Sequence, residues 1–149
     1  MDILNDAMKA LTDTVSGFWP QPSEKPGLEN GKLRPCPGTP NCVCSENSDS
    51  PGRVEPVAYG KMEHEKAWTL LKKVVDEMGG AVQDEAENYL WTTFSVPLFG
   101  FVDDVEFRLE KTGNVIHVRS ASRLGFSDLG VNRNRVDDIR RRFVAQKTG

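Results

Sequence analysis

Four strand-like segments follow one another in residues 81–123, and the turns between them are too short to hold a helix. Alternating apolar residues, with many β-branched and aromatic side chains, predict strands at 81–86, 89–96, 101–111 and 115–123. Consecutive strands with such short connections pair antiparallel. The pattern therefore predicts an antiparallel sheet as the centre of the fold.

Helical periodicity flanks these strands. Residues 63–78 predict one helix, which Gly79-Gly80 would end, and residues 133–146 predict a second. A further strand is expected at 53–59. The resulting order, β-α-β-β-β-β-α, predicts an α+β fold with a sheet of about five strands and helices over one face. The helix faces expected to be buried consist of Ala67, Leu71, Val74 or Val75, Met78, Val136, Ile139 and Phe143.

The 149 residues suit one domain with an appendage. Residues 1–18 are predicted to form a short amphipathic helix. Residues 19–52 are predicted to form a linker, which holds most of the nine prolines, and residues 53–149 to form the α+β domain. No apolar run is long enough to cross a bilayer, and Asp2 and Asp6 stand where a signal peptide carries basic residues. We expect a cytoplasmic protein from the sequence as written.

Arginine is concentrated near the C-terminus of a chain whose net charge is −3. From Arg119 to Arg142 the sequence carries seven Arg, three Asp and no Lys. Guanidinium groups bind carboxylate or phosphate with two parallel hydrogen bonds, so the cluster favours an anion or ion pairs. Nucleic acid is not an expected partner, because no basic stripe alternates with aromatic residues.

The hairpin of strands 101–111 and 115–123 has one face that changes from apolar to polar. A turn at Thr112-Gly113 pairs Phe107 with Val118, Val105 with Ser120 and Asp103 with Ser122. Buried polar groups need hydrogen-bonding partners, so this end of the face predicts an internal network or a ligand. On the opposite face, Glu106 and Arg119 are expected to form a cross-strand ion pair.

Asn132 is a good N-cap for the last helix, but two arginines follow in its first turn, where the helix dipole disfavours cations. A negative group nearby would explain them. We therefore hypothesise a pocket for a small anionic molecule or an acidic partner group, with no cofactor. Its ligand-binding residues would be Arg119, Ser120, Ser122, Arg123, Ser127, Asn132, Arg133 and Arg135, and its supporting carboxylates Asp103, Asp104, Glu106 and Asp128.

Two alternatives stay open for the same residues. In the first, the protein is an enzyme in which Asp103 or Asp128 is a general base and the arginines stabilise negative charge. In the second, the Arg–Asp network only braces the last helix against the sheet. Asp103 and Asp104 are adjacent on a strand and point to opposite faces, which argues against a shared glycosidase or metal site.

Three cysteines, Cys36, Cys42 and Cys44, lie in the predicted linker. Zinc normally needs four ligands, and His64 and His117 are the only histidines, so no metal site is expected. A Cys36–Cys42 disulfide is sterically reasonable, although a cytoplasmic chain should keep it reduced. A simple turn attached to the domain is the favoured interpretation.

Three stretches resemble the DUF1499 family, a bacterial and algal family of unknown function: residues 36–45 (CPGTPNCVCS), 99–108 (FGFVDDVEFR) and 118–135 (VRSASRLGFSDLGVNRNR). The resemblance covers about residues 34–146, and Cys44 stands where a Ser is expected. It implies no activity. Many relatives carry a signal or membrane segment before this domain. The predicted element order also resembles TATA-binding-protein-like and helix-grip folds, an analogy that assigns no site.

Overall fold

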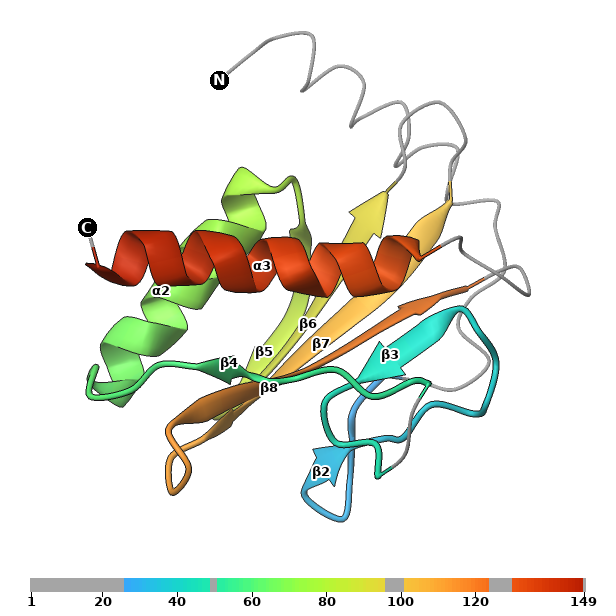
Figure 1. Ribbon diagram of the computed structural model, residues 1–149, viewed down its shortest axis with the longest axis horizontal. Coiled ribbons are helices and arrows are strands. Elements are labelled where there is room, and N and C mark those ends of the chain that lie inside the picture. The colour runs from blue at the N-terminus through green and yellow to red at the C-terminus, as the bar shows by residue number, and fades with distance from the viewer. Residues whose placement is uncertain (1–25, 49–50, 96–100, 124–129, 149) are drawn as a thin grey trace, which may run out of the picture.

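The computed structural model describes residues 26–48, 51–95, 101–123 and 130–148. The fold is α+β, with antiparallel sheets and two helices, as the sequence predicts (Figure 1). The expected N-terminal helix lies outside the described residues. So do Ser127 and Asp128 of the hypothesised pocket.

The main sheet has the strand order β3-β8-β7-β6-β5, and β4 also pairs with β8. A separate two-stranded sheet joins β1 to β2. The strands are β1 (Leu28–Glu29), β2 (Lys32–Leu33), β3 (Cys42–Cys44), β4 (Val57–Ala58), β5 (Ala81–Ala86), β6 (Tyr89–Ser95), β7 (Val102–Glu110) and β8 (Val115–Ser122).

The register of the β7–β8 hairpin agrees with the prediction from its turn. Phe107 pairs with Val118, Val105 with Ser120 and Asp103 with Ser122. Glu106 lies directly opposite Arg119, and the predicted ion pair is formed at 3.6 Å. Because side chains alternate along a strand, this register fixes which polar residues share a face.

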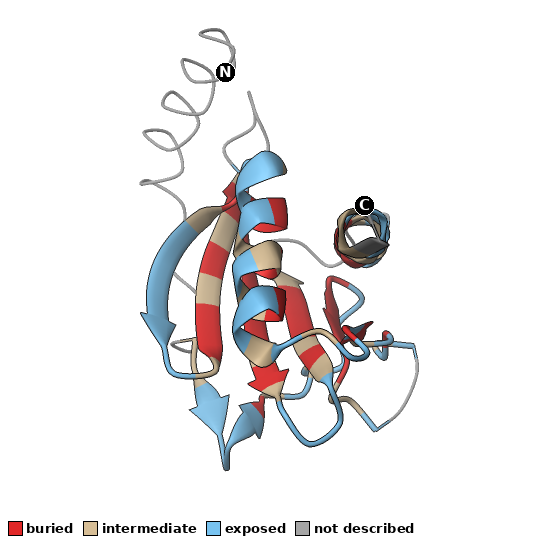
Figure 2. Cartoon of the chain, turned by 90° about the vertical axis from the view of Figure 1, so that its left-hand side faces the viewer, coloured by how far each residue is buried: buried red, intermediate tan, exposed pale blue. Residues whose placement is uncertain are grey.

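Helices α2 (His64–Glu77) and α3 (Val131–Thr148) cover one face of the main sheet (Figure 1). Figure 2 shows their buried sides turned toward the strands. The apolar stripes predicted from periodicity are buried against Phe107, Ile116 and Val118 of the sheet. Burial of this apolar surface is the main stabilisation of the helix layer. The buried helix residues are Ala67, Leu71, Val74, Val75, Val136, Ile139 and Phe143.

The other face of the sheet, called the outer face below, is partly covered by the segment that contains β2. Leu33 is buried there together with Cys44 and Tyr89, and Cys36 and Trp91 pack against this small cluster. The main sheet therefore has a cover on each face: the two helices on one and the chain around residues 26–36 on the other.

Three local predictions are corrected. Cys42–Cys44 is an edge strand of the main sheet rather than part of a linker. The strand expected at 53–59 is reduced to β4, since Pro56 has no N–H to donate to a ladder. Asn132 is not an N-cap: α3 starts one residue earlier, after Gly130, whose φ of +82° suits glycine.

In the parts of the chain that the structure describes, no helix is long and apolar enough to cross a membrane.

Candidate functional site

The sheet divides the residues of the hypothesised pocket between its two faces. Asp103, Ser120 and Ser122 point toward α3, whereas Arg119 and Arg123 lie on the outer face with Asp104 and Glu106. The sequence analysis already placed Asp103 and Asp104 on opposite faces, but it treated the arginines as one group. The structure contains two separate polar clusters instead.

On the helix face, α3 is joined to the sheet by a buried network around Asn132. The Ser120 hydroxyl donates to Asn132 Oδ1 at 2.6 Å, and Asn132 Nδ2 donates to Ser122 Oγ at 2.9 Å. Arg135 donates to Asn132 Oδ1 at 3.0 Å and forms an ion pair with Asp103 at 2.7 Å. Its guanidinium also lies 5.1 Å from the centre of the Phe94 ring.

This network matches the bracing interpretation of the sequence. Asn132 and Ser120 are fully buried, and Asp103 is only 3% exposed. Hydrogen bonds within the network satisfy polar groups that would otherwise be costly to bury. Asp103 is poorly placed to act as a general base on a substrate, because it is buried and faces a guanidinium.

On the outer face, two of the predicted arginines are paired with the predicted carboxylates. Arg123 donates from Nε and Nη2 to the two oxygens of Asp104, both at 2.9 Å, and Trp91 Nε1 donates to Asp104 Oδ1. Arg119 lies 3.6 Å from Glu106 and also donates to the carbonyl of Arg34 at 2.9 Å. The pairing of Arg123 with Asp104 is the bidentate geometry typical of strong ion pairs.

Arg34 is a member of the outer-face cluster that the sequence analysis missed. Its guanidinium lies 3.8 Å from Glu106 Oε1, and its backbone carbonyl binds Arg119. The segment that carries it lies about 85 positions from Arg119 in sequence. Local patterns give no signal for such a contact. The only signal in the sequence is the position of Arg34, two residues before the first family-like stretch.

Glu106 is the buried centre of this cluster. Its Oε2 accepts hydrogen bonds from the Tyr89 hydroxyl at 2.7 Å and from Gly27 N–H at 3.0 Å. Its Oε1 has no hydrogen-bond partner among the described residues and faces the two guanidinium groups. Burial raises the pKa of Tyr89, and the hydrogen bond to Glu106 raises it further. Tyr89 therefore stays a neutral donor to Glu106.

A cavity of about 460 Å³ opens over this cluster, and we call it the arginine cavity. It is bounded by β7 and β8 on one side and by the chain around residues 34–42 on the other. Its size is in the range of small-molecule sites. The charged and polar residues that line it are Glu29, Arg34, Thr39, Asn41, Asp104, Glu106, Arg119, Ser122 and Arg123.

A second charged group on the outer face joins β3 to the middle of the hairpin. Arg108 binds both oxygens of Glu46, at 2.9 and 2.7 Å, and Ser45 Oγ lies 2.9 Å from His117 Nδ1. Burial would raise the pKa of Glu46, but hydrogen bonds from Arg108 and the Leu33 N–H lower it overall. Burial lowers the pKa of His117, and nearby Glu46 and Glu110 offset this only partly.

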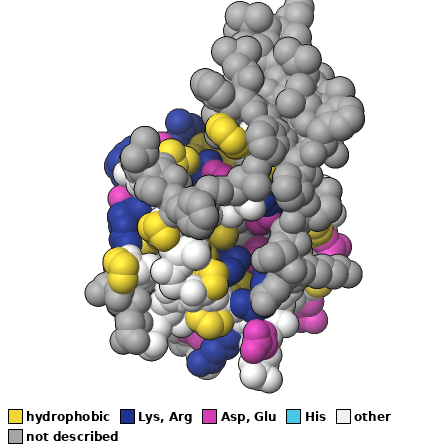
Figure 3. Space-filling view, turned by 90° about the vertical axis from the view of Figure 1, so that its right-hand side faces the viewer, with side chains coloured by type: hydrophobic (Ala, Val, Ile, Leu, Met, Phe, Trp, Pro, Cys, Tyr) yellow, Lys and Arg dark blue, Asp and Glu magenta, His cyan; other side chains and the backbone are white. Residues whose placement is uncertain are grey.

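Arg133 joins neither cluster. Its guanidinium donates to the backbone carbonyls of Pro51 and Arg53, across the gap between α3 and the loop before β4. It lines a second cavity, next to the arginine cavity but on the α3 side of β3. Figure 3 shows hydrophobic and basic side chains next to one another on the side of the molecule where these loops lie.

Two of the three cysteines lie at the wall between the two cavities. Cys36 and Cys42 form a disulfide, and both cavities are lined by this pair. Cys44 is free and buried, and burial raises the pKa of its thiol, which makes it a poor nucleophile. Within the described ranges, no group of three or more His, Cys, Asp or Glu residues could hold a metal ion.

All three family-like stretches meet at the disulfide loop. Residues 36–45 form the loop and β3, Asp104 and Glu106 come from the second stretch, and Arg119, Arg123 and Arg133 come from the third. The protein is thus a small α+β domain with two cavities beside a disulfide-closed loop.

The model of one protein family matches residues 32–143, and its description is "protein of unknown function (DUF1499)". The chain belongs to the DUF1499 family. A search of curated proteins found no match to the chain.

Proposed function

We propose that this protein is a binding module that takes up a small polyanionic molecule in the arginine cavity. The observation that carries the proposal is the convergence of Arg34, Arg119 and Arg123 on one cavity from separate parts of the chain. Arginine forks are suited to carboxylate and phosphate groups, and a half-enclosed site strengthens such hydrogen bonds.

The carboxylates in the cavity support this proposal by positioning the arginines. Asp104 fixes the plane of the Arg123 guanidinium through two hydrogen bonds, and Glu106 lies between Arg34 and Arg119. A guanidinium whose orientation is already fixed loses less conformational entropy when it binds a ligand. The carboxylates also favour anions that carry hydroxyl or N–H donors over bare anions.

A titration calorimetry series with citrate and inorganic phosphate tests the proposal. We expect saturable citrate binding with a Kd of about 1 mM or tighter, a modest affinity for a small ligand. The paired substitution Arg123→Gln with Asp104→Asn keeps the net charge constant and should weaken citrate binding about tenfold. The matched control removes the exposed Lys72–Glu85 ion pair, at 3.1 Å, and should leave binding unchanged.

A purely structural role is the second candidate, and the completeness of the helix-face network favours it. In that case neither anion would bind saturably, and the Arg123→Gln, Asp104→Asn protein would differ from the natural one in melting temperature alone. The same experiment therefore separates the two functions.

A further inference from the structure

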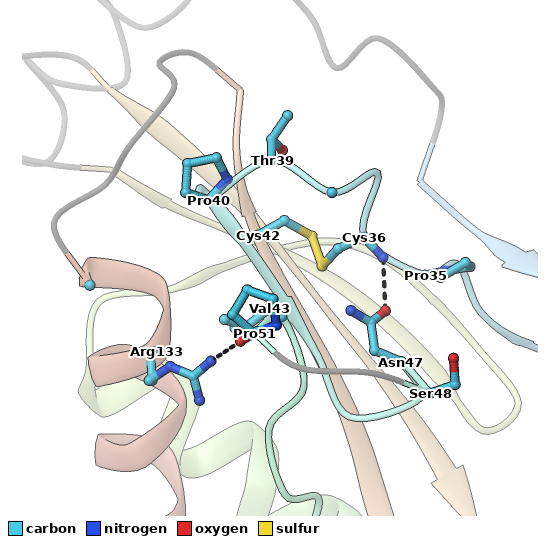
Figure 4. Close-up of a pocket in the computed structure, with 13 residues that line it drawn as sticks. Pro35, Cys36, Thr39, Pro40, Cys42, Val43, Asn47, Ser48, Pro51 and Arg133 are labelled. Atoms are coloured by element: carbon cyan, nitrogen blue, oxygen red, sulfur yellow. Dashed lines mark hydrogen bonds between the residues drawn. A yellow bond between two sulfur atoms is a disulfide. The ribbon is translucent and has the colours of Figure 1, made fainter.

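The cavity on the α3 side of β3 differs in chemistry from the arginine cavity. It has a volume of about 480 Å³ and lies between the disulfide loop, residues 47–48 and 51–52, and the first turn of α3 (Figure 4). We call it the proline cavity, because its apolar wall consists of Pro35, Pro40, Val43, Pro51 and the Cys36–Cys42 disulfide.

Arg133 is the only ionisable side chain among the described residues that line the proline cavity. Figure 4 shows it extending from α3 toward Pro51. The guanidinium is held by the backbone carbonyls of Pro51 and Arg53, and no described carboxylate forms an ion pair with it. Arg123 and Arg135, by contrast, each face an aspartate. Among the described residues, Arg133 therefore has no carboxylate within ion-pair distance, and Glu55 and Asp137 line a separate pocket that Arg133 also borders.

The remaining polar groups of the cavity add donors and no negative charge. Asn47 Oδ1 accepts the N–H of Cys36 at 2.9 Å, which leaves the amide N–H groups of Asn47 as donors beside the cavity. The guanidinium of Arg133 has further N–H groups besides the two that bind carbonyls. Both side chains therefore offer N–H donors to a negatively charged group in the cavity.

We propose that the proline cavity binds an organic monocarboxylate with an apolar body. The carboxylate would bind Arg133, and the body would lie against the prolines, Val43 and the disulfide. One cation on an apolar wall selects one anionic group joined to hydrocarbon, whereas the arginine cavity presents three cations and three carboxylates. The inference is independent of the proposed function, because the two cavities are lined by different charged residues.

Benzoate is a suitable probe, and benzamide is its neutral counterpart of nearly the same shape. We expect the full chain, followed by amide NMR, to bind benzoate saturably in the millimolar range, with shifts at residues 38–43, 47–48, 52 and 130–133. Benzamide should bind about tenfold more weakly. Equal binding of the two probes, or no saturable shift with benzoate up to about 10 mM, would overturn the proposal.

Two variants show whether Arg133 is the anchor. Arg133→Gln should weaken benzoate binding about tenfold, while Arg133→Lys should retain part of it. Arg140→Gln is the matched control: Arg140 lies on the same helix, also donates to a loop carbonyl, that of Glu55, and does not line the proline cavity. Unchanged benzoate binding in folded Arg133→Gln, or an equal loss in Arg140→Gln, would contradict the proposal.

Discussion

The arginines of this protein differ in role. The role of each depends on the group that its guanidinium binds. Arg135 is buried against Asp103 and holds α3, so its charge is used inside the fold. Arg123 is fixed by Asp104 and lines the arginine cavity, where we propose that it binds a ligand. Arg133 binds only backbone carbonyls among the described residues. At the residue scale, the arginines differ in where their partners lie: Arg135 pairs with Asp103 against the core, whereas Arg123 pairs with Asp104 beside a cavity.

Asp103→Asn should destabilise the protein because it leaves the Arg135 charge buried without a carboxylate. Breaking a buried pair from one side costs about 3 kcal/mol in free energy of unfolding. Urea unfolding would measure the loss. Adding Arg135→Gln to the same protein should recover part of it, whereas an additive further loss would show that the two side chains do not act as a pair.

His117 should make the stability depend on pH. Its pKa is lowered in the folded state, so the unfolded chain binds more protons as the pH falls through the ordinary histidine range near 6.5. The free energy of unfolding should therefore be highest above pH 7 and should decrease as the pH falls below about 6.5.

Urea unfolding at pH 7.5 and 5.5 tests this dependence, with His117→Gln as the comparison. The difference between the two pH values should be smaller in the variant. His64→Gln is the control, because it removes the other histidine of the chain. A His117→Gln protein that retains the full pH dependence would assign the effect to other groups.

At the scale of elements, the helices and the long hairpin could be predicted, because their signals are local. Periodicity placed α2 and α3 within two residues of their observed ends, and one turn fixed the register of β7 and β8. β3 could not be predicted. It has three residues among prolines, and pairing with β8, about 80 positions away, holds it in place. Arg34 was missed from the site for the same reason.

The disulfide should stabilise the loop that separates the two cavities. Closing a loop of this length contributes about 2 kcal/mol to the free energy of unfolding in the chain-entropy model. Reductant should therefore lower the melting temperature of the natural protein and have no effect on the Cys36→Ser, Cys42→Ser variant. Cys44→Ala should remain sensitive to reductant. A natural protein whose melting is indifferent to reductant would contradict this role.

At the scale of the whole molecule, the fold brings three distant parts of the chain to one loop. The sequence alone predicts a single pocket where the strand ends meet the start of the last helix. Strand alternation separates these residues, so that Asp103 and Asn132 brace the core while Arg119 and Arg123 reach the outer face. The sequence could predict which residues take part in the polar clusters. It could not predict how they divide between the two faces, because that division also depends on β3 and Arg34.

A ligand of the arginine cavity should stabilise the molecule as a whole, since it binds the folded state and not the unfolded chain. At a citrate concentration of 100 times the Kd, the free energy of unfolding should rise by about 2.7 kcal/mol. Differential scanning calorimetry would show this as a higher melting temperature. The Arg123→Gln, Asp104→Asn protein should gain clearly less from the same citrate concentration.

The most direct test of anion binding in the arginine cavity is NMR of the arginine side-chain Nε–Hε groups during a citrate titration. If the arginine cavity binds citrate, we expect saturable shifts at Arg34, Arg119 and Arg123, with Arg135 and Arg140 unchanged. Shifts spread evenly over all arginines, or none that saturate, would contradict this binding and leave the arginine cluster as part of the fold alone.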